Sequence, residues 1–199
     1  MGICSIKDLR VRTPVLFIQG GGEGAHQEDD LLATSLRKAL GAEYDVRYPR
    51  MLGESEPEMQ TWKAQIAREL AALDGKVVLV GHSLGGSALM RHLSEEMGEK
   101  PIAGLFLLAA PSWDEENWNF DDLQLPRDLA AKLSRIPRLF LYHNRDDEIV
   151  PFSHLALHAA RLPRAVVRES EKGGHQFGGD LGNVASDIRS ATQADQTQL

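Results

Sequence analysis

Short apolar runs alternate along the chain with longer stretches in which apolar residues recur at helical spacing. The short runs are mostly rich in branched or aromatic side chains and occupy residues 15–18, 44–48, 77–80, 105–108, 139–142 and 165–167. Continuous apolar runs of this length are typical of strands that are buried on both faces, as in a parallel sheet. We therefore expect these segments to form one mostly parallel sheet.

The longer stretches predict helices between these strands. Trp62, Ile66, Leu70 and Leu73 recur at steps of four, four and three residues, which places them on one face of a helix. A second helix is predicted over residues 84–95, where apolar and polar side chains separate onto two sides. Because strand and helix alternate down the chain, the pattern predicts a three-layer α/β/α sandwich with right-handed crossovers.

The length and composition of the chain indicate one domain with a sizeable core. The chain has 199 residues, of which 42% are hydrophobic and 26% are charged. No repeat and no long linker divides it, so we expect residues 1–199 to form a single domain with frayed ends at 1–12 and 192–199. Cys4 is the single cysteine, which excludes an internal disulfide and a multi-cysteine zinc site.

The charge balance and the apolar runs narrow the classes of partner. With 22 basic and 29 acidic residues the formal charge is -7, which disfavours binding to nucleic acid. The apolar runs are far shorter than the ~20 residues that a membrane span needs. Residues 1–4 resemble an acylated N-terminus, but Ile6 stands where the myristoylation pattern needs Ser or Thr. We expect a cytoplasmic protein that acts on a small-molecule substrate, and the sequence is silent on any protein partner.

The strongest chemical motif is Gly81-His82-Ser83-Leu84-Gly85, which lies between a predicted strand and a predicted helix. In a G-x-S-x-G turn the serine occupies a strained strand-to-helix junction, and side chains at the glycine positions would collide with the neighbouring backbone. The helix N-terminus also leaves unpaired N–H groups beside the serine. The motif predicts that Ser83 is a nucleophile, and the alternative is a tight turn with a capping serine.

A serine nucleophile needs a base and an acid, and both follow in the chain order Ser, Asp, His. Carboxylates come directly after the predicted strand 139–142, and we favour Asp147 over Asp146 as the acid because it begins the Asp-x-x-Val-Pro pattern. His175 follows Gly173-Gly174 after the last predicted strand, on a loop flexible enough to reach the serine. The other histidines are interpreted as structural or surface residues.

The glycine-rich segment 19–24 follows the first predicted strand and is expected to form half of an oxyanion hole. We assign the donors to the backbone N–H groups of Gly21 and Leu84, the latter being the residue after the nucleophile. Gly22 belongs to the same loop and is expected to line the substrate site.

Two other motifs are weighed and set aside. Gly20-x-Gly22-x-x-Ala25 fits a dinucleotide fingerprint, but Tyr48-Pro49 stand where the confirming acid should lie. His154 and His158 are four residues apart and could share a metal, but no third ligand is evident, so surface positions are expected instead. We therefore predict neither a metal nor an organic cofactor.

Together these motifs resemble the α/β-hydrolase superfamily. The marks that carry the resemblance are the Gly20–Gly22 loop, the Gly81–Gly85 turn, the Asp147-x-x-Val150-Pro151 pattern and Gly174-His175. The compact chain is most similar to small, lid-poor serine hydrolases of the retinoblastoma-binding-protein type. The resemblance implies a sheet of about six parallel strands and a Ser–His–Asp triad. The chain departs from the family at one point, because Gln19-Gly20 stands where the family usually has a His-Gly pair in the oxyanion loop.

Substrate specificity is assigned to the segment 112–126, which follows a predicted strand at the edge where ligands bind. Its aromatic residues Trp113 and Trp118 are expected to line an acyl pocket, and the alternative is a crossover that covers the core. His82 is expected to shape the Gly81–Gly85 turn, hereafter the elbow, or the wall of the pocket.

The sequence thus predicts a serine hydrolase that cleaves small carboxylic esters through an acyl-enzyme intermediate. Thioesterase, peptidase and acyltransferase activities would use the same triad with a different pocket. The alternative outside enzymes is a binding protein that keeps the hydrolase fold and has negligible turnover.

Overall fold

The computed structural model describes residues 12–96, 98–113 and 123–196 and contains one six-stranded sheet. The strands are β1 (Thr13–Ile18), β2 (Tyr44–Arg47), β3 (Val77–His82), β4 (Ile102–Leu108), β5 (Leu139–Asn144) and β6 (Val166–Ser170). Their order is β2-β1-β3-β4-β5-β6, and every neighbouring pair is parallel. The α/β fold predicted from the alternation is confirmed.

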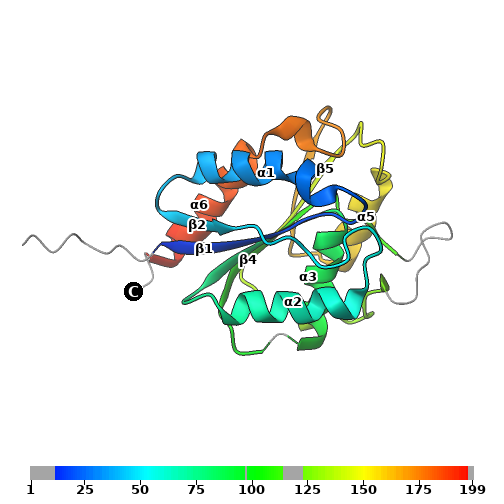
Figure 1. The fold of residues 1–199 in the computed structure, drawn as a ribbon. Helices are drawn as coiled ribbons and strands as arrows, with labels where there is room; N and C mark the ends of the chain where they lie inside the picture. The colour runs from blue at the N-terminus through cyan, green and yellow to red at the C-terminus, as the bar shows by residue number, and fades with distance from the viewer. Residues whose placement is uncertain (1–11, 97, 114–122, 197–199) are drawn as a thin grey trace, which may run out of the picture.

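Helices cover both faces of this sheet (Figure 1). They are α1 (Ala25–Leu40), α2 (Met59–Ala71), α3 (Leu84–Glu96), α4 (Leu129–Lys132), α5 (Ser153–Arg161) and α6 (Gly182–Gln196), with a 3₁₀ turn at Phe177–Gly179. Helices α1 and α6 lie together on one face, and α2 and α3 pack on the other. Right-handed crossovers between parallel strands produce this division into two outer layers.

The central strands bury alternate side chains in two separate apolar clusters. In β1, Leu16 and Ile18 join the cluster that includes α2 and α3, whereas Val15 and Phe17 join the cluster beneath α1 and α6. All four side chains are fully buried, which explains why the run lacks the polar alternation of a one-sided strand. Each such side chain stabilises the fold by roughly 1.5–3 kcal/mol.

The sheet order places two loops at one point on its edge. The chain leaves β1 toward β2 and then returns to β3 on the other side of β1. Because all strands are parallel, their carboxyl ends meet at the same edge, and ligands of open α/β sheets bind where the order reverses. The loop after β1 carries Gly20 to Gly24, and the turn after β3 carries Ser83.

The ends of the sheet differ from the prediction in burial. Strand β6 pairs only with β5, and all of its residues are exposed, so the expectation of a strand buried on both faces is wrong there. An edge strand has one neighbour, and the polar residues Arg168 to Ser170 suit its contact with solvent. Ala165, which the sequence assigns to this strand, lies just before it.

The last described element is a helix that packs against the body of the protein. Helix α6 continues to Gln196, and residues 197–199 lie outside the described ranges, as do 1–11. Ala191 is buried, and the hydroxyls of Thr192 and Tyr44 are 2.7 Å apart. These contacts with the body of the protein hold the last turns of the helix.

Candidate active site

The strand-to-helix turn at Ser83 is strained in the way the glycine spacing predicts. Ser83 has a φ of 51°, in the left-handed region that side chains rarely adopt. A Cβ at Gly85 would lie 2.3 Å from the carbonyl oxygen of Gln19, and a Cβ at Gly81 would lie 2.7 Å from the Gly86 backbone. The two glycines therefore allow β1 and α3 to approach the turn, and this close packing holds Ser83 in its conformation.

The loop after β1 lies directly against this turn. A Cβ at Gly20 would be 3.3 Å from the Cβ of Ser83, and one at Gly21 would be 2.5 Å from Cδ2 of Leu84. Glycine at these positions lets the loop backbone come within reach of a group bound to Ser83.

Two N–H groups at this junction have no protein acceptor among the described residues, those of Gly21 and Leu84. Their neighbours are paired: the N–H of Gly20 donates to Asp29 Oδ2 at 2.8 Å and that of Gly22 to the Glu54 carbonyl oxygen at 2.6 Å. The N–H of Ser83 donates to the carbonyl oxygen of Leu108 at 2.8 Å. The unpaired groups are the two that the sequence assigns to an oxyanion hole.

Asp147 and His175 are in direct contact. His175 Nδ1 lies 2.9 Å from Asp147 Oδ2 and 3.1 Å from Oδ1. The other side of the carboxylate is held by the main chain, because Oδ1 accepts from the N–H groups of Ile149 at 2.9 Å and Val150 at 2.8 Å. The Asp147 side chain is fully buried, and that of His175 is 9% exposed. The acid is thus fixed in place and orients one imidazole.

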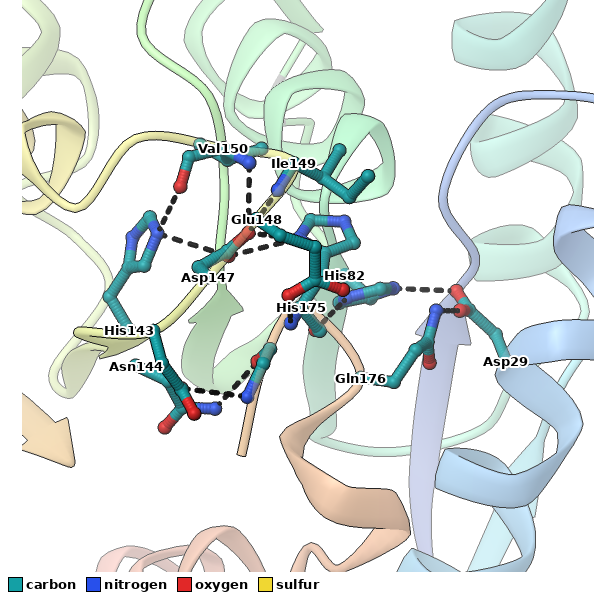
Figure 2. Close-up of polar contacts among 12 residues, drawn as sticks. Asp29, His82, His143, Asn144, Asp147, Glu148, Ile149, Val150, His175 and Gln176 are labelled. Atoms are coloured by element: carbon teal, nitrogen blue, oxygen red, sulfur yellow. Dashed lines mark hydrogen bonds and ion pairs between the residues drawn. The ribbon is translucent and has the colours of Figure 1, made fainter. Parts of the chain in front are cut away.

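A second histidine, His143, lies on the far side of Asp147 (Figure 2). Its Nε2 is 3.1 Å from Asp147 Oδ2 and 3.0 Å from the carbonyl oxygen of Val150. Burial favours a higher pKa for Asp147, but the hydrogen bonds with His143 and His175 and from the Val150 N–H lower its pKa well below the ordinary value. The sequence placed His143 merely at a strand end, and its contact with Asp147 was missed.

The depressed pKa of Asp147 makes stability depend on pH. The carboxylate stabilises the folded state above the pKa of an unfolded aspartate, about 3.9, and this contribution is lost as the pH falls toward the folded pKa. We expect the free energy of unfolding to decrease from about pH 4 downward, and less steeply in Asp147→Asn. Urea unfolding between pH 3 and pH 6 checks this. An equally steep decline in the variant would contradict it, and Asp45→Asn, at a half-exposed surface position, is the control.

The loop that carries His175 is anchored by side chains from the end of β5 and the loop after it. Asp146 accepts from the N–H groups of Gly173 at 3.2 Å and Gly174 at 2.8 Å, and Asn144 Nδ2 donates to the Gly174 carbonyl oxygen at 2.8 Å. Glu148 Oε2 accepts from the His175 N–H at 3.2 Å. Asp146 is exposed, as the sequence interpretation expected, but it also shapes the histidine loop.

The turn that carries Ser83 contacts His175 through His82, and no hydrogen bond joins Ser83 to His175 within the described ranges. The ring of His82 is 4.6 Å from the His175 ring, measured between centroids, and His82 Nε2 is 3.0 Å from the His175 carbonyl oxygen. Ser83 is partly exposed, and its hydroxyl forms no hydrogen bond within the described part of the chain. The structure therefore brings His175 together with Asp147 and places both beside the elbow, with the serine hydroxyl free.

Two residues assigned to substrate binding, His82 and Trp113, have buried side chains. The side chain of His82 is 1% exposed and points into the interior. Trp113 is buried, and its Nε1 donates to Ser87 Oγ at 2.9 Å, so its indole packs into the protein. The N–H of Gly22 is occupied by Glu54, and Trp118 lies outside the described residues.

A cleft of about 800 Å³ opens beside the loop after β1. Its lining residues are Glu23, Gly24, Arg50, Met51, Leu52, Gly53, Glu54 and Ser55. They come from the loops after β1 and β2, not from the segment 112–126 that the sequence analysis favoured. This cleft is therefore built mainly from polar and apolar side chains of residues 50–55.

Gln19, at the end of β1, and Glu54, in the loop after β2, hydrogen-bond to each other. Gln19 Nε2 donates to Glu54 Oε2 at 2.8 Å, and Gln19 Oε1 accepts from the Met51 N–H at 3.1 Å. The hydrogen bond from Gln19, with a further one from Arg50, lowers the pKa of Glu54 although the side chain is buried. Gln19 thus ties β1 to the loop after β2.

His154 and His158 are buried, so the expectation of surface positions is wrong. His154 Nδ1 accepts from the Ser112 N–H at 2.9 Å, and His158 Nε2 lies 3.2 Å from the carbonyl oxygen of Ala110. Burial lowers the pKa of His158 to about 4. Within residues 12–96, 98–113 and 123–196 no group of three or more potential ligands is close enough to hold a metal ion, and no helix is long and apolar enough to cross a bilayer.

Comparison with known proteins shows the family of the chain. The family described as serine hydrolase matches residues 25–180 of the chain. None of the curated proteins matches the chain by sequence.

Solved structures share the fold. The ydeN gene product of B. subtilis is 21% identical, and the match covers 91% of this chain and 99% of that chain with a TM-score of 0.67. A serine hydrolase from Cycloclasticus zankles is 15% identical over 93% of this chain and 90% of that chain, with a TM-score of 0.69. Est1E from Butyrivibrio proteoclasticus, solved with ferulic acid, is 14% identical over 96% and 92%, with a TM-score of 0.67.

Proposed function

The chain belongs to the serine hydrolase family, and from this premise we propose that it cleaves small carboxylic esters through an acyl-enzyme intermediate on Ser83. The observation that carries the proposal is the pairing of His175 Nδ1 with the buried Asp147 carboxylate at 2.9 Å, beside the strained turn at Ser83. This pairing leaves Nε2 as the free nitrogen of the imidazole, which is the nitrogen that a triad uses.

The reaction follows from the protonation of that ring. His175 Nε2 takes the hydroxyl proton of Ser83 as Oγ bonds to the ester carbonyl carbon, and Asp147 stabilises the imidazolium. The C–O bond to the alcohol then breaks, and the alcohol leaves with the proton from Nε2. Water attacks the acyl-enzyme in the same way, which releases the acid and restores the Ser83 hydroxyl.

The free Ser83 hydroxyl is compatible with this role. A serine changes its rotamer without moving the backbone, and catalytic hydrogen bonds are often long in unliganded enzymes and shorten when substrate binds. Since Ser83 is partly exposed, a carbonyl group can reach Oγ from outside.

The N–H groups of Gly21 and Leu84 are proposed as the oxyanion donors. Both lack an acceptor within the described ranges, and a donor aimed at the developing oxyanion stabilises the transition state by roughly 3 kcal/mol. They belong to different elements, the loop after β1 and the start of α3, which Gly21 and Leu84 bring into contact.

Gly21→Ala tests this assignment. The added Cβ would lie 2.5 Å from Leu84 Cδ2 and 3.0 Å from Pro57 Cγ, so the loop must move away from the elbow. We expect kcat to fall about 10- to 100-fold while KM changes little, as measured with a chromogenic acetate ester. Gly182→Ala is the control, since Gly182 has no positive φ and its added Cβ would meet only the exposed Asp180 side chain, 3.2 Å away, at the start of α6. A variant that keeps full kcat would show that Gly21 is not a donor.

Small esters are proposed as substrates, and the cleft beside the loop after β1 is proposed to accept part of the ester. It combines the apolar side chains of Met51 and Leu52 with the charged Glu23 and Arg50. The ferulic acid bound to Est1E and the lipolytic enzymes among the similar structures supply the analogy for carboxylic ester chemistry. The closer likeness to hydrolases of the retinoblastoma-binding-protein type stays a prediction.

A fluorophosphonate probe tests the proposed function directly. We expect the wild-type protein to gain one phosphonyl group, located by peptide mass spectrometry on Ser83, and to hydrolyse acetate and butyrate esters faster than a matched thioester or peptide anilide. A protein that resists the probe and hydrolyses none of these compounds would be a binding protein on a hydrolase fold. The unbonded Ser83 hydroxyl makes this alternative worth the test.

A further inference from the structure

Asp29 and His82 form a second buried carboxylate–imidazole pair next to the proposed triad. His82 Nδ1 lies 2.8 Å from Asp29 Oδ2, and each side chain is 1% exposed. Asp29 comes from α1 and His82 from the last position of β3, directly before Ser83. Neither side chain touches the space outside the protein, and the mechanism above does not use them.

Both ring nitrogens of His82 face acceptors. Nδ1 faces the Asp29 carboxylate, and Nε2 faces the carbonyl oxygen of His175 at 3.0 Å. The ring of His82 thus spans the distance between the Asp29 carboxylate and the backbone of His175.

The remaining contacts of Asp29 reach two further segments, and Figure 2 shows the contact with Gln176. Oδ2 also accepts from the N–H of Gly20 at 2.8 Å, and Oδ1 accepts from Gln176 Nε2 at 3.0 Å. Burial favours a higher pKa for Asp29, but the charge and hydrogen bond of His82, with the bonds from Gly20 and Gln176, lower its pKa. The carboxylate thus joins the residue before Gly21 to the residue after His175.

We propose that Asp29 and His82 are positioning residues that hold the oxyanion loop and the backbone of His175 in register with Ser83. The inference rests on the proposed function. His82 fixes the His175 carbonyl from the elbow, and Asp29 fixes His82, Gly20 and Gln176 at once. We call the contacts of Asp29 with His82, Gly20 and Gln176 the junction. A displacement of about 1 Å of a reacting group can reduce the rate by about 10²-fold, so loss of the junction affects turnover more than binding.

Asp29→Asn removes the charge and keeps the shape. The amide oxygen can take the place of Oδ2, and the NH₂ group then lies at Oδ1, where the Gln176 amide must turn over to accept from it. The hydrogen bonds to Gly20 and His82 then lose their charge and weaken. We expect kcat to fall about 10- to 100-fold with KM within about threefold of the wild type.

Asp30→Asn is the matched control, because it makes the same change one residue along α1 at an exposed position. It should keep wild-type kcat and KM. Each variant is also treated with the fluorophosphonate probe, and the rate of labelling is compared after correction for the folded fraction, measured by circular dichroism. We expect slow labelling of Asp29→Asn and unchanged labelling of Asp30→Asn.

Gln176→Met provides a second variant in case Asp29→Asn does not fold. Gln176 is partly exposed, and its amide reaches Asp29 from the His175 loop, so its loss breaks one arm of the junction at lower cost to folding. We expect kcat to fall about 3- to 10-fold with KM unchanged.

The outcomes separate the inference from the proposed function. If the wild type forms a probe adduct while folded Asp29→Asn and Gln176→Met both keep kcat within twofold, the positioning role is wrong and the function stands. If Asp29→Asn does not fold and Gln176→Met keeps full kcat, the pair is structural and the positioning role is again wrong. If the wild type forms no adduct, the proposed function fails and the inference fails with it.

Discussion

Ser83→Ala is expected to reduce kcat for ester hydrolysis by about 10⁴- to 10⁶-fold, to the level left by binding and the oxyanion donors alone. The methyl group cannot form the acyl-enzyme, and the turn tolerates alanine because Ser83 makes no side-chain hydrogen bond within the described ranges. Steady-state assays on a chromogenic ester measure the loss of kcat, and intact mass spectrometry measures the loss of the acyl-enzyme.

Ser190→Ala is the matched control for this variant. Ser190 is exposed on α6, and its hydroxyl donates only to the Ser186 carbonyl oxygen of its own helix, so loss of that group should leave kcat unchanged. If Ser83→Ala hydrolyses the ester within tenfold of the wild type, the nucleophile lies elsewhere. The fold would then stand, but the proposed acyl-enzyme route would not.

Asp147→Asn is expected to reduce kcat by about 10⁴-fold with little change in KM. The N–H groups of Ile149 and Val150 both donate to Oδ1, so the amide oxygen takes that position and the NH₂ replaces Oδ2. It then donates to His175 Nδ1, which leaves the ring proton on Nε2. A ring protonated there cannot accept the hydroxyl proton of Ser83.

Asp146→Asn gives the contrast for this prediction. Asp146 holds the N–H groups of Gly173 and Gly174 and does not contact the His175 ring, so we expect less than about a tenfold loss of kcat. Steady-state kinetics of the two variants under identical conditions decide between the adjacent carboxylates. A larger loss in Asp146→Asn than in Asp147→Asn would overturn the choice of Asp147 as the acid.

Local patterns were enough to predict the fold and the position of the elbow. The apolar runs of β1 and β3 are continuous because both faces of those strands are buried, and this signal lies within a few residues. Glycines at positions 81 and 85 follow from close backbone contact at the turn, which also acts over a short range. The prediction of burial on both faces was wrong at β6, because the residues of a strand do not by themselves determine its place in the sheet order.

The polar supports of the site were mostly missed. Asp29 left one signal, since it interrupts the apolar stripe of α1 formed by Ala25, Leu32 and Leu36. Glu54 lies in a loop, and His143 lies at the end of a strand, where polar residues are common. Their partners are distant in the chain, so no spacing rule relates them before the fold brings them together.

The sequence by itself determined the parallel α/β architecture, the strained turn at Ser83 and the loop that carries His175, because each depends on residues that are close in the chain. Only the tertiary structure decided that His175 meets Asp147, that His143 supports the acid from behind, and that Asp29 joins His82 to both loops. Such contacts depend on distances between separate segments, and those distances exist only after the sheet has assembled.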